Sequence, residues 1–313
     1  MRLTPLTPVE VKLVMTIKRP IQSWVNGVLQ TTIAITDRSV QYGDGFFTTL
    51  LAMNSAVYNW QAHWWRLKTS ALRLGFRSLD EKNTLSLIAS ALTSDPTLTS
   101  PNTPLAIKLI ITRGQSGQGY QTTPNAQPTF IVQVRAHPVF KTYADMHQLP
   151  LAIELGLCQT FSSIQPQLAG LKHLNRLENV LAQNELASLG LSEGLMLNAN
   201  QEVVCATQSN LFLIKGQQLL TPALHNSGVA GTTRYQMADL AQRFGLEYVE
   251  KTIFLSEVHS ADELFLTNAL RGVMPVKQFQ TTHYSTNKSL KIHQAWLTWQ
   301  KQHCKVLNAS ANH

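Results

Sequence analysis

The spacing of hydrophobic residues divides the first half of the chain into short strands and two amphipathic helices. Segments 104–114 (PLAIKLIITRG) and 129–137 (TFIVQVRAH) are rich in β-branched residues, which favour strands. In segments 62–76 and 84–94 the hydrophobic residues recur every three or four positions, which predicts helices. A shorter strand is expected at Ala56–Trp60. This mixture predicts an α+β domain.

The second half mixes strands and helices in the same way. It begins with an expected strand at 151–160, and a helix that contains Lys172 follows. A second helix is predicted at 232–245 (TTRYQMADLAQRFG). The other expected strands are 194–206, 210–222, 246–254 and 263–269.

A candidate linker separates the two halves. Segment Pro138–Pro150 has proline at both ends and weak periodicity, which is typical of a connection between domains. We therefore expect two α+β domains. The predicted divisions are an N-terminal extension 1–24, a small domain 25–137, the linker 138–150, a larger domain 151–300 and a C-terminal tail 301–313.

A lysine stands where a loop turns into one of the predicted helices, in GLKHLNRLENVLAQNEL (170–186). Leu174, Leu177, Val180 and further leucines recur at helical spacing, so one face of this helix is apolar. Lys172 precedes that face and could point away from the core. Two interpretations stay open at this point: a solvated surface lysine, or a lysine held over a cofactor.

Composition narrows the class of protein. The chain has 313 residues, of which 44% are hydrophobic, so it can bury a sizeable core. Its three cysteines are far apart, which argues against a disulfide framework or a zinc cluster and suggests a reducing cytoplasm. No apolar run approaches the roughly 18 residues of a membrane span, and the N-terminus lacks a signal-peptide pattern. Whether translation starts at Met1 or Met15 stays open.

The net charge of +8 indicates anionic partners. The basic residues are scattered, without a dense run or interleaved aromatic residues, so nucleic-acid binding is not expected. A positive field also attracts small polyanions such as phosphate esters and dicarboxylates. The ten histidines are dispersed and lack metal-ligand spacing, so no metal site is expected.

Three stretches could carry chemistry. In Ser227–Gln242, glycines precede Thr232 and Thr233 at a predicted helix start, where free N–H groups, hydroxyls and the helix dipole suit a phosphate. An ordinary capped helix is the alternative. Asp37–Leu50 (DRSVQYGDGFFTTL) fits a tight turn leading into a strand, and Thr112–Thr123 (TRGQSGQGYQTT) fits a hairpin loop or a substrate lid.

These stretches belong to a series of six segments whose order along the chain is informative. They are DRSVQYGDGFFTTL, HWWRLKTSALRLG, GLKHLNRLENVLAQNEL, SNLFLIKGQQLLTP, SGVAGTTRYQMADLA and ADELFLTNALRGVMPV. Together they resemble the fold-type IV family of pyridoxal-phosphate (PLP) enzymes, which includes branched-chain and D-amino-acid aminotransferases and aminodeoxychorismate lyases. The resemblance covers about Val25 to Gln300, and the KHLNRLE and RGQSGQGY segments are most similar to the lyases. It implies a two-domain α+β fold.

The resemblance also assigns roles. It implies that Lys172 is the Schiff-base lysine, whose amine must be neutral to attack the cofactor aldehyde. Arg66 resembles the arginine that binds the cofactor phosphate. The other implied cofactor residues are Val229 beneath the pyridine ring, Gly231, Thr232 and Thr233 around the phosphate, and Cys205 and Asn210. Weaker candidates for the substrate pocket are Arg38, Tyr42, Gln118, Tyr120 and Arg176.

One position departs from the family pattern. The family places a glutamate, the partner of the pyridine nitrogen, five residues before the asparagine of the N-x-F motif, but five residues before Asn210 stands Cys205. Glu202 is three residues further off, so on a regular strand it faces the other side. A thiol is a poor partner for a pyridinium, which implies a weaker electron sink.

The resemblance implies a function. We expect a cytoplasmic, homodimeric, PLP-dependent lyase that converts 4-amino-4-deoxychorismate, a small dicarboxylate, to 4-aminobenzoate and pyruvate for folate biosynthesis. A branched-chain or D-amino-acid aminotransferase on the same fold is the alternative. Cys205 also leaves open a PLP-binding protein with little turnover.

Overall fold

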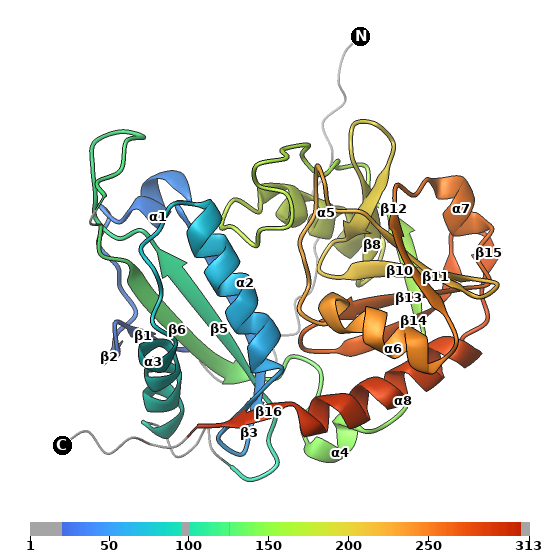
Figure 1. The fold of residues 1–313 in the computed structure, drawn as a ribbon, viewed down its shortest axis with the longest axis horizontal. Coiled ribbons are helices and arrows are strands. Elements are labelled where there is room, and N and C mark those ends of the chain that lie inside the picture. The colour runs from blue at the N-terminus through green and yellow to red at the C-terminus, as the bar shows by residue number, and fades with distance from the viewer. Residues whose placement is uncertain (1–20, 95–99, 125, 308–313) are drawn as a thin grey trace.

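The strands form two sheets that lie beside each other as two lobes (Figure 1). A computed structural model describes residues 21–94, 100–124 and 126–307. Within these residues one sheet has seven strands, drawn mainly from the first half of the chain, and the other has nine from the second half. The two mixed lobes agree with the predicted α+β class.

Antiparallel strands with regular alternation form the centre of the small lobe. β5 pairs with β3 on one side and with β6 on the other. Leu105, Ile107, Leu109 and Ile111 of β5 alternate along the strand and join one buried cluster, as period-two spacing requires. The sheet order is β16-β4-β3-β5-β6-β1-β2. The strands are β1 (Gln22–Val25), β2 (Val28–Leu29), β3 (Gly45–Met53), β4 (Ala56–Tyr58), β5 (Leu105–Thr112), β6 (Thr129–Ala136) and β16 (Cys304–Val306).

Two amphipathic helices cover this sheet near the predicted positions. α2 (Trp60–Arg73) packs on β3, and α3 (Glu81–Thr93) packs on β6. A shorter helix, α1 (Arg38–Tyr42), begins where the side chain of Asp37 accepts a hydrogen bond from the Ser39 N–H group. The stretch interpreted as a turn before a strand is therefore a capped helical turn followed by β3.

The large sheet is buried on both faces. Along β10, Leu211 and Leu213 join one buried cluster while Phe212 and Ile214 join another, so this strand is a continuous apolar run. The strand order is β12-β11-β10-β13-β14-β7-β8-β9, with β15 on β14. These strands are β7 (Ile153–Leu157), β8 (Gly194–Leu197), β9 (Val203–Ala206), β10 (Asn210–Lys215), β11 (Gln218–Pro222), β12 (Glu247–Lys251), β13 (Glu263–Asn268), β14 (Gly272–Phe279) and β15 (Thr282–His283).

The C-terminal helix connects the two lobes. α8 packs on β13 and β14 of the large sheet and then leads into β16, which pairs with β4 of the small sheet (Figure 1). Part of the predicted C-terminal tail is therefore an edge strand. The helices of this half are α4 (Tyr143–Met146), α5 (Leu177–Ser188), the 3-10 helix η2 (Arg234–Gln236), α6 (Met237–Arg243), α7 (Leu255–His259) and α8 (Asn287–Gln302).

The loop before α5 differs from what the sequence predicted, and the N-terminal segment lies partly outside the described residues. The helix predicted to contain Lys172 begins only at Leu177, so the lysine lies in the preceding loop. Most of the predicted N-terminal extension lies outside the described residues, and β1 begins at Gln22, near its predicted end. The proposed domain boundaries stay predictions.

Candidate active site

Backbone pairing on both sides fixes the loop that carries Lys172. We call residues 170–176 the lysine loop. The Phe47 N–H group of β3 donates to the Lys172 carbonyl at 2.9 Å. On the other side the Gly170 N–H group donates to Gly228 O, and the Ala230 N–H group donates to Gly170 O, both at 2.9 Å. The lysine is therefore held between the start of β3 and the segment before η2.

The Lys172 ammonium lies in an environment that favours its neutral form. Its Nζ atom lies 4.6 Å from the centre of the Phe47 ring. Burial first, and then the charges of Arg66, Arg176 and Lys108, together lower the pKa of Lys172 to about 7, while Cys205 opposes them. A solvated surface lysine does not fit these surroundings.

Arg66 is a buried cation without an acidic partner. It lies on α2, is 5% exposed, and donates through Nη2 to the Thr48 hydroxyl. Its Nε atom has no hydrogen-bond partner, and no described carboxylate forms an ion pair with it. Burial lowers the pKa of the guanidinium to about 9. Because an unpaired buried charge is costly, this geometry favours an anion at Arg66.

A turn with free donors lies close to this arginine. We call Gly231–Thr233 the phosphate turn. Among the described hydrogen bonds, none uses the N–H groups of Thr232 and Thr233. A side chain at Gly231 is excluded, because its Cβ would lie 2.0 Å from Asn210 Oδ1. Asn210 Nδ2 in turn donates to the Val229 carbonyl at 2.9 Å, which fixes the approach to the turn.

The helix dipole contributes less here than the sequence indicated. The predicted helix 232–245 divides into η2, with three residues, and α6, with seven. Only short runs of aligned peptide dipoles stand behind the phosphate turn. Its anion affinity must therefore come mainly from direct donors and from Arg66.

Two polar residues beside the phosphate turn were not found from the sequence. His63 lies one helical turn before Arg66 on α2, and its ring contacts the hydroxyls of Thr48 and Thr232. Thr48 lies on β3 and accepts from Arg66. The signal available in the sequence was a histidine three positions before the arginine, in HWWR.

Cys205 shares the interior with Lys172, and Glu202 does not. Burial raises the pKa of the Cys205 thiol to about 12, with the charges of Arg176 and Lys172 acting in the opposite direction. The register shifts between β8 and β9, so that Val204 is an extra residue in β9. Such a bulge could have turned Glu202 toward the site. Glu202 instead precedes β9 and accepts from Asn198 Nδ2 at 2.6 Å. The residue near the lysine is therefore a neutral thiol.

A buried acid supports the turn between β9 and β10. Glu193 is 1% exposed and accepts from the hydroxyls of Thr207 and Ser209 at 2.7 and 2.6 Å. Burial raises the pKa of its carboxyl, and these hydrogen bonds oppose the rise. Glu193 was not singled out in the sequence. It fixes the turn that connects Cys205 with Asn210.

The candidate substrate residues fall into two groups. Arg176 lies with Lys172, where its Nη2 donates to the Leu171 carbonyl at 3.0 Å. Arg38 donates to Asp44 and to three carbonyls of the 116–120 loop, so four of its N–H groups are already used within the chain. Its contact with substrate stays a prediction.

The aromatic candidates lie beside that loop. The rings of Tyr42 and Tyr120 meet edge to face at 5.5 Å, and the Arg38 guanidinium lies 4.7 Å from the Tyr42 ring. Tyr120 is 89% exposed, and Gln118 is exposed as well. Within this chain these side chains do not line a closed pocket around Lys172, so their role also stays a prediction.

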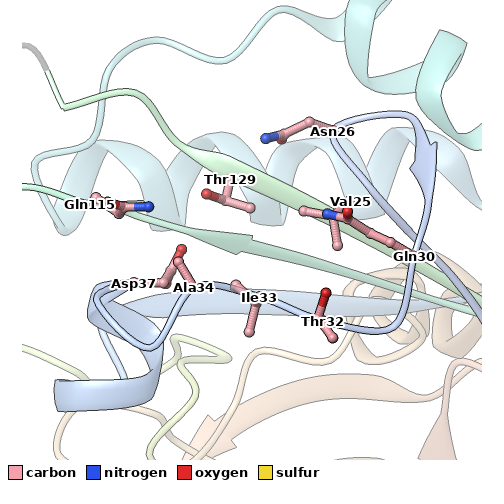
Figure 2. A pocket seen from close by; sticks show the side chains of 9 residues that line it. All are labelled: Val25, Asn26, Gln30, Thr32, Ile33, Ala34, Asp37, Gln115 and Thr129. Carbon is pink, nitrogen blue, oxygen red and sulfur yellow. The ribbon is translucent and has the colours of Figure 1, made fainter.

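A separate hollow of about 430 Å³ lies in the small lobe. Figure 2 shows it between the segment before α1 and the sheet, with Thr32, Ile33, Gln115 and Thr129 around it. Asp37 also borders it, but its carboxylate already accepts from Ser39 and Thr112. The hollow is lined by none of the predicted cofactor residues.

Comparison with known proteins gives the site a family. The family model described as amino-transferase class IV matches residues 45–279. The chain belongs to this family. A relative named aminodeoxychorismate lyase, from Vibrio harveyi, is 34% identical over 81% of this chain and 89% of its own length. Family membership confirms the expected fold class and PLP dependence.

Two further similarities bear on the type of enzyme. The crystal structure of 4-amino-4-deoxychorismate lyase from Pseudomonas aeruginosa superposes with a TM-score of 0.77 at 31% identity, covering 88% of this chain and 97% of that one. A putative branched-chain-amino-acid aminotransferase from Methanocaldococcus jannaschii is 27% identical over 78% of this chain and 81% of its own length. Both the expected lyase and its alternative therefore have relatives.

Neither a membrane-spanning helix nor a metal site is found among the described residues. No helix there is long and apolar enough to cross a membrane. No group of three or more histidine, cysteine or acidic side chains in the described part of the chain could hold a metal ion.

The pKa of Lys172 predicts how the cofactor-free protein responds to pH. Only the neutral amine attacks an aldehyde, and it predominates above the pKa. The rate of PLP incorporation, followed by absorbance, should rise with pH, reach half its maximum near pH 7 and then level off. Arg176→Met removes a charge that lowers this pKa, so its midpoint should move upward. A wild-type midpoint near the ordinary lysine value of 10.5 would contradict the prediction.

Proposed function

We propose that this protein is a PLP-dependent lyase that converts 4-amino-4-deoxychorismate to 4-aminobenzoate and pyruvate. The observation that carries the proposal is the pairing of a lysine whose pKa is lowered to about 7 with a buried arginine that lacks a counter-charge. The first suits covalent attachment of an aldehyde cofactor, and the second suits its phosphate. The lyase relatives support this choice of reaction.

The residues present fit the cofactor. Arg66 and the N–H groups of Thr232 and Thr233 would hold its phosphate, and Lys172 would hold it covalently. Val229 and Cys205 would face its ring, as the family pattern implies. When bound, PLP supplies an electron sink that stabilises negative charge on the substrate carbon that loses a proton. Exclusion of water by the surrounding lobes would strengthen these contacts.

Lys172 has the proton affinity needed for a shuttle. A group with a pKa of about 7 holds comparable amounts of base and conjugate acid near neutral pH. In the proposed reaction the lysine takes the proton from ring carbon C4 and returns a proton to the leaving enolpyruvyl group. The products then have the same atoms as the substrate, so no oxidant or co-reactant is needed.

The charges around the lysine support an anionic substrate. Arg66, Arg176 and Lys108 all lower the Lys172 pKa, so three cations act on this one point. Lys108 Nζ lies 4.8 Å from the Phe47 ring, the same ring that Lys172 contacts at 4.6 Å. With Arg66 assigned to the phosphate, Lys108 and Arg176 remain to attract the carboxylates of a dicarboxylate, although Arg176 also lies 3.9 Å from the Glu178 carboxylate. Three free cysteines support a reducing cytoplasm as the compartment.

An aminotransferase is the second candidate, favoured by the 27% identity to the putative branched-chain enzyme. The thiol of Cys205 argues against it, because transamination depends on a strong electron sink. Aromatisation to 4-aminobenzoate supplies driving force of its own, so the lyase reaction tolerates a weaker sink. A PLP-binding protein with little turnover is the third candidate and rests on the same cysteine.

Purified protein with PLP should release 4-aminobenzoate and pyruvate in equal amounts from 4-amino-4-deoxychorismate. Lys172→Ala should lose the absorbance band of lysine-bound cofactor and nearly all turnover, because no other described group combines its position with its pKa. Circular dichroism and thermal melting should show that the variant stays folded. Efficient transamination of D-alanine or branched-chain amino acids without 4-aminobenzoate would overturn the lyase assignment.

Replacement of Cys205 tests its position at the ring. Cys205→Glu should offer a charge-assisted partner to a protonated ring nitrogen, giving tighter PLP binding, a shifted absorption spectrum and some side transamination. A pocket too apolar for the carboxylate would instead lose the cofactor, because an unpaired buried charge costs several kcal/mol. Cys205→Ser is the neutral control. A glutamate variant with unchanged spectrum, affinity and stability would show that this strand is wrongly aligned with the family.

We also infer a homodimer in which part of the site crosses the interface. Leu177, Val180 and Leu181 on α5 are each more than half exposed, although they form the apolar face recognised in the sequence. Exposed apolar side chains on one helix suit a partner surface. The exposed Tyr120 loop would then reach the second copy's site.

Sedimentation or light scattering should therefore give twice the mass of 34.9 kDa for the active protein. Leu177→Glu combined with Leu181→Glu should give monomers, because charges at a buried interface are costly. Leu189→Glu, at an exposed leucine beyond the end of α5, is the matched control. A monomeric wild type with full activity would contradict the inference.

A further inference from the structure

His63 is almost fully buried and connects two hydroxyls that lie on different lobes. It is 1% exposed. Its Nδ1 atom lies 2.6 Å from Thr48 Oγ1 on β3, and its Nε2 atom lies 3.4 Å from Thr232 Oγ1 in the phosphate turn. Arg66 completes the row, since its Nη2 donates to Thr48 and lies 3.5 Å from His63 Nδ1.

The Arg66 guanidinium orders the hydrogen bonds that join Thr48, His63 and Thr232. A guanidinium can only donate, so Thr48 Oγ1 accepts from Arg66. The same Nη2 group, which can only donate, also lies 3.5 Å from His63 Nδ1, which favours an unprotonated Nδ1 that accepts the Thr48 hydroxyl proton. The ring proton therefore lies on Nε2 and points to Thr232 Oγ1. Thr232 accepts from the ring and keeps its own proton for another acceptor.

The surroundings keep the ring neutral, as this order requires. Burial and the neighbouring charge of Arg66 both lower the pKa of His63 well below its ordinary value. A cationic ring would carry protons on both nitrogens and could not accept from Thr48. The order of protons is thus stable across the neutral pH range.

The two threonines of the phosphate turn differ as a result. The Thr233 hydroxyl donates to the Asn268 carbonyl at 2.9 Å, so its proton is already used. Thr232 accepts at its hydroxyl from His63, and its backbone carbonyl accepts from Asn59 Nδ2 at 3.2 Å. Asn59 caps the start of α2, and His63 and Arg66 follow it on that helix, so the first turns of α2 organise the phosphate turn.

We propose that His63 is a positioning residue, which fixes the Thr232 hydroxyl as a donor to a phosphate monoester bound at Arg66. The proposal rests on the proposed function, because that ester is the cofactor phosphate. His63 acts through Thr232 and does not touch the cofactor. We call the hydrogen bonds from Arg66 through Thr48 and His63 to Thr232 the relay. With it, three kinds of donor point to the phosphate: a guanidinium, backbone N–H groups and one oriented hydroxyl.

The test compares PLP with pyridoxal, which has the same aldehyde and ring but no phosphate. Dissociation constants of both are measured by absorbance and fluorescence titration of cofactor-free protein. His63→Asn can keep the contact with Thr48 but cannot reach Thr232, so PLP binding should weaken roughly five- to tenfold. Its pyridoxal binding should stay within about twofold of wild type, a loose bound on an unaffected contact.

A conservative variant and a double-mutant cycle separate positioning from general structural damage. His63→Gln places an amide N–H near the Nε2 position and should bind PLP close to the wild-type level. Thr232→Val removes the hydroxyl, so adding His63→Asn to it should weaken PLP binding no further. This non-additivity is the signature of a residue that acts only through Thr232.

Three outcomes would overturn the relay: unchanged PLP affinity in His63→Asn, equal loss of PLP and pyridoxal in both His63 variants, or additive losses with Thr232→Val. Thermal melting of each variant accompanies the titrations. If His63→Asn fails to fold, the PLP affinity of His63→Gln is compared with that of His63→Gln combined with Thr232→Val. The relay predicts wild-type affinity in the single variant and a loss in the double variant. Wild-type protein that binds neither PLP nor pyridoxal would overturn the proposed function itself.

Discussion

A buried guanidinium without a counter-ion is the constraint on which this site depends. Arg66 is enclosed by both lobes, and its described partners are hydroxyl and imidazole groups rather than a carboxylate. Burying a charge costs several kcal/mol unless it is paired, so the cofactor-free fold is less stable than its packing alone would allow. An anion that binds at Arg66 offsets this cost. With the cofactor phosphate proposed as that anion, folding stability and cofactor affinity would be linked through one side chain.

The same constraint explains why two lobes are needed. Arg66, His63 and Thr48 belong to the small lobe, whereas the phosphate turn and Lys172 belong to the second half of the chain. The lysine loop joins them, because its backbone pairs with β3 on one side and with Gly228–Ala230 on the other. This close approach favours glycine at Gly45, where a Cβ would lie 2.8 Å from Leu174 Cδ1 of the lysine loop and 2.7 Å from the Ile111 carbonyl of β5. The cation and the lysine are thus placed by main-chain pairing, which varies little with side-chain motion.

Local patterns predicted the elements well and their surroundings less well. The strands β5 and β6 and the helices α2 and α3 follow from periodicity, and the strands β10 and β13 follow from continuous apolar runs that are buried on both faces. Periodicity misplaced the start of α5, because the leucine spacing continues through a loop that pairs with β3 instead of coiling. Periodicity shows that one face of a helix is apolar, but it does not show whether residues of the same chain bury that face. The exposed leucines of α5 illustrate this.

The site was predictable only where one residue sits in a distinctive local sequence. Lys172, Arg66 and the phosphate turn lie in such segments. Lys108 and Glu193 do not, and Phe47 and Thr48 lie in such a segment without being singled out. The importance of all four comes from tertiary contacts that the sequence does not display. Arg38 shows what a motif leaves open, since its side chain braces the neighbouring 116–120 loop and its contact with substrate stays a prediction.

Electrostatics connects the unusual cysteine with the lysine. Lys172 is acted on by three cations, and Cys205, whose pKa is raised to about 12, adds no negative charge at neutral pH. A carboxylate at that position would stabilise the ammonium and raise the Lys172 pKa, as the small opposing effect of Cys205 already indicates. The lysine would then be protonated more of the time and would be a poorer base. In the proposed lyase reaction, a neutral thiol at the ring would weaken the electron sink but keep the low pKa of Lys172, and aromatisation would supply driving force that makes the weaker sink tolerable.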